Sequence, residues 1–288
     1  MEFLHNLPTI ETGPKTNYRI KICVNFDGKP YHDTITNPYL LEKINQFIAC
    51  DFKVRYAYFQ KSNTSQEYGI IISNDGDHKT IYDKIKDDIE LTVFGYQSKD
   101  EITYLTTNTR IRNQYYDFDW KVSINGFVQP NPYVGTLIHE IVDRMIIKDT
   151  DYMFYGLGGE SGVYGYNGKF TESLCLTNSK SIYDDYKNNK KDNKICLIDY
   201  EKDQLNQHIN NDDKKILLVN ISRNGLRKLA HQITKLNFEQ IIYIGCCDKA
   251  VSQDIEILQK RYKINEIKKL IQFPETEYYS YVICFINK

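Results

Sequence analysis

The sequence predicts an α/β protein with a mainly parallel sheet, preceded by an α+β segment whose strands are mostly antiparallel. The first observation is a change near residue 130, where a succession of strand-like runs becomes an alternation of strands and helices. Helical segments between strands are typical of βαβ units, which build parallel sheets. The second observation is length, because 288 residues are enough for two domains that each bury a core.

The segment before residue 130 is expected to be α+β. Its strands are predicted by runs of branched and aromatic residues bounded by Gly, Asn and Asp. These runs are Tyr18–Phe26, Lys53–Gln60, Gly69–Ser73, Ile89–Tyr96, Ile102–Thr107 and Trp120–Phe127. A helix is expected at Pro38–Cys50, because its apolar residues recur at helical spacing and Asn37 can cap it. We assign residues 1–128 to an amino-terminal domain.

The segment after residue 130 alternates between helix and strand, and we assign residues 129–288 to a second domain. Helices are expected at Pro132–Lys148, Ser179–Asn188, Gly225–Leu236 and Lys249–Tyr262. Strands are expected at Asp151–Tyr155, Ser173–Thr177, Lys194–Ile198, Ile216–Ile221, Ile241–Cys246, Ile264–Phe273 and Tyr279–Ile286. The connection between the last two strands is too short for a helical crossover, so these strands are expected to pair antiparallel.

Composition and charge exclude several classes of protein. The formal net charge of -1 offers no overall attraction to nucleic acid, so any such binding must be local. The seven cysteines include no CxxC pair, which argues against zinc and indicates reduced thiols. The amino terminus lacks a signal-peptide pattern, and no apolar run approaches the roughly eighteen residues of a membrane span. We expect a cytoplasmic protein with no membrane and no metal partner.

Cys246 closes an apolar strand pattern just before a helical pattern begins. Open α/β sheets bind their ligands at the carboxyl ends of the strands, so Cys246 is a candidate nucleophile. The alternative is a buried structural thiol, because free cysteine is among the most buried residue types. The neighbouring Cys247 is expected to be buried or incidental.

A glycine-rich segment, Gly156-Leu157-Gly158-Gly159, follows the first strand of the second domain. Glycines at this place let the backbone approach a nucleotide or nucleoside closely. Ordinary loops contain glycine clusters too, so the pattern by itself leaves both interpretations open.

Basic and aromatic residues are mixed near the end of the amino-terminal domain. Arg110, Arg112 and Lys121 lie among aromatic residues and could form a face that stacks on bases and contacts the phosphates of single-stranded RNA. A plain core hairpin explains the pattern equally well. Arg223 is either a surface cation or a phosphate contact. His139 falls among the polar positions of its helix and is expected to face solvent.

Five segments carry a resemblance to a known family. They are Phe127-Val128-Gln129-Pro130-Asn131, Phe154-Tyr155-Gly156-Leu157-Gly158, Asn220-Ile221-Ser222-Arg223-Asn224-Gly225-Leu226, Tyr243-Ile244-Gly245-Cys246-Cys247 and Gln272-Phe273-Pro274-Glu275-Thr276. In this order they resemble motifs of the S-adenosylmethionine-dependent RNA uracil-C5 methyltransferases, the tRNA 5-methyluridine branch most of all. The resemblance covers about residues 16 to 288. It implies a Rossmann-like methyltransferase domain with a mixed, mainly parallel seven-stranded sheet, after a candidate RNA-binding domain.

The resemblance implies methyl transfer from S-adenosylmethionine to C5 of a uridine in tRNA-like RNA. In that chemistry a thiolate, here Cys246, adds to uracil C6, and a base later removes the C5 proton. The family has a glutamate as this base, and Ser280 stands at its position. The implied cofactor contacts are Gln129, Phe154, Gly156, Gly158, Gly159, Asn178 and Asn220. The implied RNA contacts are Arg223, Arg110 and Arg112.

Several positions depart from the family's pattern. Asn178 and Asn220 stand where the family has carboxylates, and an amide cannot accept hydrogen bonds from two hydroxyls as a carboxylate does. Gly159 replaces an asparagine of the tRNA branch. The nearby carboxylates that could compensate are Glu160, Glu275 and Glu277.

Two hypotheses follow from the retained and the replaced residues. In the first, the protein is an active RNA methyltransferase with Cys246 as nucleophile. In the second, it is a catalytically degenerate member, a pseudoenzyme that has lost the cofactor and binds RNA or a protein partner. The sequence leaves both open.

Overall fold

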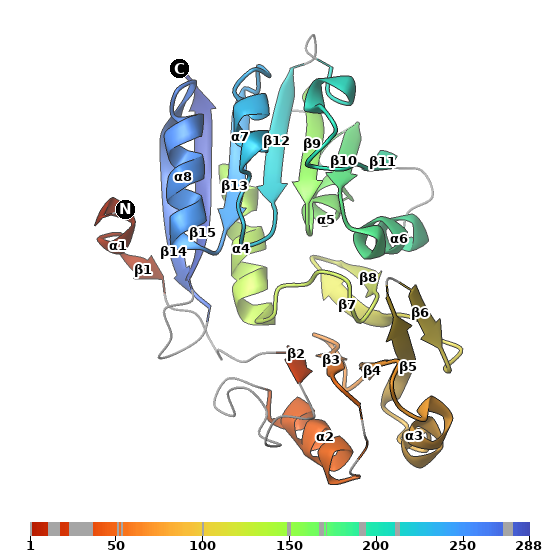
Figure 1. The fold of residues 1–288 in the computed structure, drawn as a ribbon. Coiled ribbons are helices and arrows are strands. Elements are labelled where there is room, and N and C mark those ends of the chain that lie inside the picture. The colour runs from red at the N-terminus through yellow and green to blue at the C-terminus, as the bar shows by residue number, and fades with distance from the viewer. Residues whose placement is uncertain are drawn as a thin grey trace. The chain divides into compact units, whose positions relative to one another are not determined.

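The computed structural model describes residues 2–10, 18–22, 37–50, 52, 54–99, 101–148, 151–166, 170, 172–189, 194–210, 214–272 and 279–288. Contacts divide the chain into two compact units (Figure 1). Unit 1 comprises Met1–Gly13 with Tyr133–Lys288, and unit 2 comprises Pro14–Pro132. This division differs from the predicted domains 1–128 and 129–288 chiefly because the first residues of the chain belong to the carboxyl-terminal unit.

Unit 1 is built on an eight-stranded mixed sheet with the order β1-β14-β15-β13-β12-β9-β10-β11. The strands are β1 (Thr9–Ile10), β9 (Met153–Gly158), β10 (Ser173–Thr177), β11 (Lys194–Leu197), β12 (Lys215–Asn220), β13 (Gln240–Gly245), β14 (Tyr262–Ile271) and β15 (Tyr279–Asn287). All neighbours are parallel except the two pairs that contain β15. The predicted seven-stranded, mainly parallel sheet with an antiparallel last pair is confirmed, and β1 is an additional strand.

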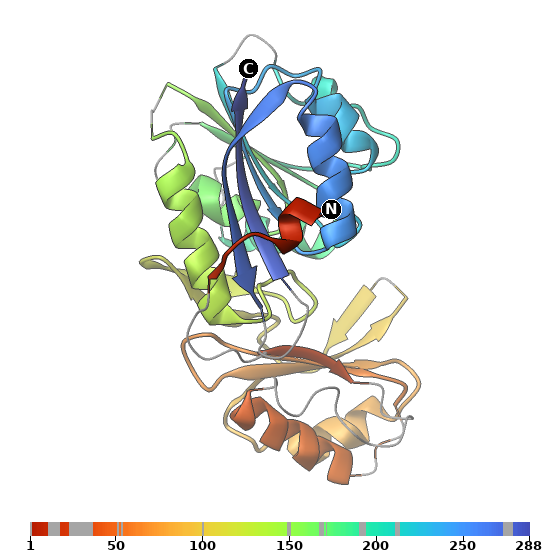
Figure 2. The same cartoon turned by 90° about the vertical axis from the view of Figure 1, so that its left-hand side faces the viewer.

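Helices cover both faces of this sheet, and Figure 2 shows the sheet between α4 and α8. The helices of unit 1 are α1 (Glu2–His5), α4 (Pro132–Met145), α5 (Ser161–Tyr166), α6 (Lys180–Asn189), the short 3₁₀ helix η1 (Leu205–Gln207), α7 (Lys228–Ile233) and α8 (Asp248–Leu258). Alternate residues of a strand point to opposite faces. Accordingly, Leu217 and Tyr243 pack with α7 and α8, whereas Leu218 and Ile242 pack with α4. Within the described ranges, none of the helices has the length and apolar content that spanning a bilayer requires.

The amino terminus is part of the core of unit 1. Leu4 is fully buried in the cluster that contains the α7 and α8 side chains. β1 then pairs in parallel with β14, with Thr9 opposite Lys269. The Lys269 ammonium also donates a hydrogen bond to the carbonyl of His5 at 3.4 Å. This segment covers one edge of the sheet, and an uncovered edge strand is prone to wrong pairing.

Unit 2 contains a five-stranded sheet with the order β2-β3-β4-β5-β6. Its elements are β2 (Arg19–Ile22), α2 (Pro38–Ala49), β3 (Ala57–Lys61), β4 (Tyr68–Ser73), α3 (His78–Ile85), β5 (Leu91–Ser98) and β6 (Glu101–Tyr104). The pairs are antiparallel except β4 with β5, as the predicted mostly antiparallel α+β class requires. The sequence did not predict α3, because its residues are mostly polar and Ile81 is its buried residue.

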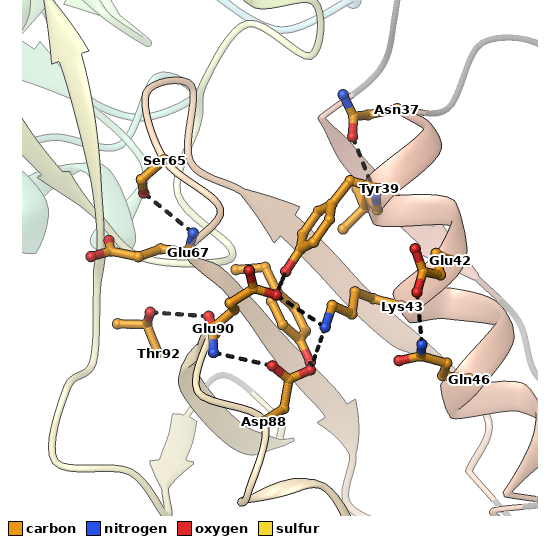
Figure 3. Close-up of polar contacts among 12 residues, drawn as sticks. Asn37, Tyr39, Glu42, Lys43, Gln46, Ser65, Glu67, Asp88, Glu90 and Thr92 are labelled. Atoms are coloured by element: carbon orange, nitrogen blue, oxygen red, sulfur yellow. Dashed lines mark hydrogen bonds and ion pairs between the residues drawn. The ribbon is translucent and has the colours of Figure 1, made fainter.

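A polar cluster joins α2 to the segment before β5 (Figure 3). The Lys43 ammonium lies 2.7 Å from Asp88 Oδ2 and 3.1 Å from Glu90 Oε2. Tyr39 donates to Glu90, and Tyr68 donates to Asp88 at 2.8 Å. Burial opposes the charge of Asp88, but the bonds from Lys43 and Tyr68 outweigh it and hold the pKa of that carboxyl below its ordinary value. These hydrogen bonds and ion pairs therefore hold α2 against the segment before β5.

Leu4→Ala should destabilise the protein much more than Phe3→Ala, its neighbour on the same helix. Leu4 is fully buried, whereas Phe3 is 45% exposed. Truncating a buried leucine costs about 2–5 kcal/mol, while surface changes usually stay within about 0.5 kcal/mol. Urea denaturation measures both free energies of unfolding. Equal values for the two variants would contradict the docking of the amino-terminal segment.

Candidate active site

Four predicted site positions lie along one edge of the unit 1 sheet. The strands β10, β9, β12 and β13 are parallel neighbours, so their carboxyl ends meet at the same edge. Asn178 follows β10, Gly158 ends β9, Asn220 ends β12 and Cys246 follows β13. This edge is where open α/β sheets bind their ligands. The structure therefore brings together residues that are separated by long stretches of sequence.

The glycine loop packs directly against Asn220. Gly158 has a φ of 82°, and a Cβ on it would lie 2.5 Å from the Asn220 carbonyl oxygen. A Cβ on Gly159 would lie 2.8 Å from the same oxygen and 3.1 Å from Cγ of the Asn220 side chain. Both positions require glycine, because any side chain would collide with β12. The absence of side chains in the loop leaves space that the Asn220 amide enters.

The Asn220 amide is buried but incompletely satisfied. The residue is 4% exposed, and its Nδ2 has no hydrogen-bond partner among the described residues. A buried donor without a partner is unfavourable by about 1–3 kcal/mol. Asn178, by contrast, is exposed at the end of β10. The edge thus has one buried amide, Asn220, and one exposed amide, Asn178, at the two positions where the family pattern has carboxylates.

Phe154 does not belong to this edge. It lies near the amino-terminal end of β9, is fully buried, and stacks on Phe170 with ring centroids 4.8 Å apart. Its predicted contact with a cofactor is wrong, because its ring is a core element beneath α4 and α5. Gly156 is likewise buried, inside the ladder between Cys175 and Leu218.

Cys246 is the one exposed cysteine among the six that the structure describes. It is therefore not the buried structural thiol that the sequence also allowed. Local desolvation raises the pKa of its thiol above the ordinary value, and Cys247 acts in the same direction. The guanidinium of Arg223, which hydrogen-bonds the Cys246 thiol, acts in the opposite direction. Arg223 is thus placed beside the candidate nucleophile, a contact that the sequence pattern did not predict.

Ser280 lies close to Cys246 in register but points into the fold. The β13–β15 ladder ends with Gly245 opposite Tyr281, so Cys246 and Ser280 are the next residues of the two strands. Ser280 is 2% exposed, and its hydroxyl accepts a hydrogen bond from Gln272 Nε2 at 2.5 Å. Glu275 and Glu277, the proposed substitutes for a base, lie outside the described residues.

His139 is buried, so the expected solvent-facing position is wrong. It is 5% exposed, stacks on Tyr164 with ring centroids 4.4 Å apart, and has Nε2 3.4 Å from the Glu160 carboxylate. Glu160 is itself 4% exposed. Its carboxylate faces His139 in the layer between α4, α5 and the sheet, which gives it a partner other than a ligand at the edge. The histidine lay among polar positions, and no sequence signal indicated the glutamate that pairs with it.

The basic and aromatic residues of unit 2 lie on opposite faces of a hairpin. In the hairpin of β7 (Ile111–Tyr115) and β8 (Phe118–Val122), Arg112 faces Lys121, whereas Asn113 faces Trp120. Trp120 is 5% exposed and cannot stack on a base. The Arg112 guanidinium also lies 3.6 Å from Asp119. The prediction of a single face of mixed basic and aromatic side chains is therefore wrong.

The other unit 2 positions are partly exposed. Arg110 precedes β7 and donates to Thr109 at 3.2 Å. Gln129 lies in the segment before α4, where the Pro130 carbonyl accepts a hydrogen bond from the Tyr18 amide at 2.8 Å. Among the described residues, no group of three or more His, Cys, Asp or Glu side chains could hold a metal ion.

Comparisons with known proteins agree with the sequence resemblance. No family model matches the chain. It is 23% identical over 273 residues to the tRNA/tmRNA (uracil-C(5))-methyltransferase of Aliarcobacter butzleri, covering 86% of this chain and 72% of that protein. It is 24% identical over 200 residues to the 23S rRNA (uracil(747)-C(5))-methyltransferase of Actinobacillus pleuropneumoniae, covering 64% of this chain and 50% of that protein.

A solved structure shows the same fold. The Pyrococcus abyssi tRNA (uracil-54, C5)-methyltransferase, solved with S-adenosyl-L-homocysteine, is 16% identical and has a TM-score of 0.70. The match covers 97% of this chain and 79% of that one. The Rossmann-like methyltransferase fold is confirmed, and the chain is similar in sequence to RNA uracil-C5 methyltransferases.

Arg223→Gln should slow alkylation of the Cys246 thiol. Loss of the neighbouring positive charge raises the thiol pKa further, so less thiolate is present at a given pH. We expect alkylation by iodoacetamide to be about threefold to tenfold slower at mildly alkaline pH. Peptide mass spectrometry measures the rate at this cysteine. Arg227→Gln, an exposed arginine of the same loop, is the matched control, and equal slowing in both variants would refute the specific contact.

Proposed function

We propose that the protein acts on C5 of a uridine in RNA, with Cys246 as the nucleophile and S-adenosylmethionine as the methyl donor. The observation that carries this proposal is the exposed Cys246 thiol beside a guanidinium, on the same sheet edge as the glycine loop. The similarity to RNA uracil-C5 methyltransferases supports it. A tRNA-like substrate follows from the tRNA enzymes among those relatives, and such a function suits a cytoplasmic protein.

The chemistry explains why a thiol is needed at this edge. Uracil C5 is a weak nucleophile until a bond forms between Cys246 Sγ and C6, which moves the C5–C6 electron pair into an enolate. C5 can then accept a methyl group. Removal of the C5 proton by a base afterwards lets the Sγ–C6 bond break. Arg223 would stabilise the thiolate before attack and after release, because its charge opposes that of sulfur.

The residues of the edge fit a nucleoside cofactor in part. Gly158 and Gly159 bring bare backbone to the carboxyl end of β9, and the buried Asn220 Nδ2 is a donor that lacks an acceptor among the described residues. Asn178 offers a second, exposed amide. S-adenosylmethionine, when bound, supplies an electrophilic methyl group. Its carboxylate and ring nitrogens are acceptors of the kind that an amide donor can bind.

A second candidate function is an RNA-binding or protein-interaction module that has lost catalysis. Ser280 favours it, because its buried hydroxyl accepts from Gln272 and has no basicity near neutral pH. Loss of a general base slows its step by about 100- to 10,000-fold. In this case, Cys246 would still add to uracil, but the adduct would persist.

Incubation with in vitro transcribed tRNA separates the two functions. With radiolabelled S-adenosylmethionine, an active enzyme should transfer methyl groups to RNA, and Cys246→Ala should abolish transfer. A protein without a base should give a denaturation-resistant protein–RNA species, visible on a denaturing gel and lost in Cys246→Ala. Cys196→Ala is the control, because Cys196 lies on β11. If neither methyl transfer nor an adduct is observed, a nucleophilic role of Cys246 is refuted.

Calorimetry with S-adenosylhomocysteine tests the cofactor site. We expect weak binding, and Asn178→Asp with Asn220→Asp should strengthen it about tenfold or more, because a charge-assisted hydrogen bond contributes about 1.5–3 kcal/mol. Asn206→Asp, at an exposed position in η1, is the matched control and should change nothing. Micromolar binding by the unchanged protein would contradict the idea that the amides weaken the site.

A further inference from the structure

The loop that carries Arg223 has an unusual backbone. It connects β12 to α7 and contains two residues in the left-handed region, Gly225 at φ 71° and Arg227 at φ 52°. A residue with a side chain rarely adopts this conformation, and it persists only where surrounding contacts enforce it. The position of the Arg223 guanidinium therefore depends on whatever holds this loop.

Asp254 is the side chain that holds the loop. It lies on α8, is 2% exposed, and its Oδ2 accepts hydrogen bonds from the Leu226 amide and the Tyr243 hydroxyl, each at 2.7 Å. The amide of Arg227 also donates to this carboxylate. One buried carboxylate thus joins a loop, a strand and a helix.

The three joined elements are those that surround Cys246. Tyr243 lies three residues before Cys246 on β13, and α8 begins two residues after it. The loop supplies Arg223 from the neighbouring strand β12. Asp254 therefore links α8 and the Tyr243 side chain, which lie on either side of the thiol in sequence, to the backbone of the loop that carries Arg223.

Gly225 shows how close this connection is. A Cβ at Gly225 would lie 2.7 Å from Asp254 Oδ2 and 3.0 Å from the Ala250 Cβ. The loop can reach the carboxylate because this residue has no side chain. The burial that comes with it raises the pKa of Asp254, against the hydrogen bonds that favour its charged form.

We infer that Asp254 is a positioning residue that holds the Arg223 guanidinium beside the Cys246 thiol. The inference rests on the proposed function, in which this thiol is the nucleophile. Among the described residues, the groups that act on the thiol are Arg223 from the loop and Cys247 from its own segment, and the Tyr243 hydroxyl is coupled to the same thiol through charge. Asp254 acts through the loop backbone rather than on the sulfur.

The pH profile of Cys246 alkylation tests the inference without RNA or cofactor. Asp254→Asn should move the midpoint to higher pH, as is expected of Arg223→Gln, because the loop no longer holds the guanidinium beside the thiol. A direct effect would have the opposite sign, since removal of a negative charge favours a thiolate. A midpoint that stays or moves to lower pH overturns the inference. Glu256→Gln, an exposed carboxylate change on the same helix, is the matched control and should leave the midpoint in place.

The double variant shows whether Asp254 works through Arg223. In the Arg223→Gln background, Asp254→Asn should cause no further shift of the midpoint, whereas full additivity of the two shifts overturns the inference. If Asp254→Asn does not fold, as judged by circular dichroism, Gly225→Ala perturbs the same contact from the loop side. It should raise the midpoint too, and an unchanged profile refutes the inference. Absence of both methyl transfer and an RNA adduct, with an intact alkylation profile, would instead refute the proposed function alone.

Discussion

The parallel pairing of β10, β9, β12 and β13 is the constraint on which the rest of unit 1 depends. Hydrogen bonding between parallel neighbours fixes their direction, so every connection that follows a strand starts at the same edge. The glycine loop, the two amides and the thiol are consequences of that arrangement. Helices cover both faces, which leaves this edge as the place where loops can meet a ligand.

At this edge, an uncharged amide in close contact with the glycine loop stands where the family pattern has a carboxylate. Gly158 and Gly159 let the β9 backbone approach Asn220, and the Asn220 amide enters the space that side chains would need. A carboxylate at position 220 would be buried here beside a carbonyl oxygen, which is unfavourable without a donor such as a ligand. An amide at this position avoids the cost of burying a charge, but it has one acceptor oxygen where a carboxylate has two. Glycine loop and amide are thus mutually consistent, whichever of the two functions holds.

The thiol shows a similar balance. Desolvation makes the Cys246 thiolate less favourable, and the Arg223 guanidinium makes it more favourable. The network around Asp254 decides whether the second effect operates, because it determines where the loop lies. By contrast, Ser280 is bound into the core through Gln272. The Cys246 thiol therefore has a neighbouring group that favours its charged form, whereas the Ser280 hydroxyl has no basicity near neutral pH.

The sequence by itself determined the two sheet classes, the order of strands and helices after residue 130 except α5 and η1, and the identity of Cys246 as the thiol at a strand end. These follow from local periodicity and from short connections, which neighbouring residues decide. The tertiary structure alone decided that Phe154 and His139 are buried, that Arg112 and Trp120 lie on opposite faces, and that the amino terminus adds β1. It also brought Arg223 to Cys246 and Asp254 to Leu226. Such contacts join residues far apart in the chain, and no local pattern records them because they arise from how the strands pack.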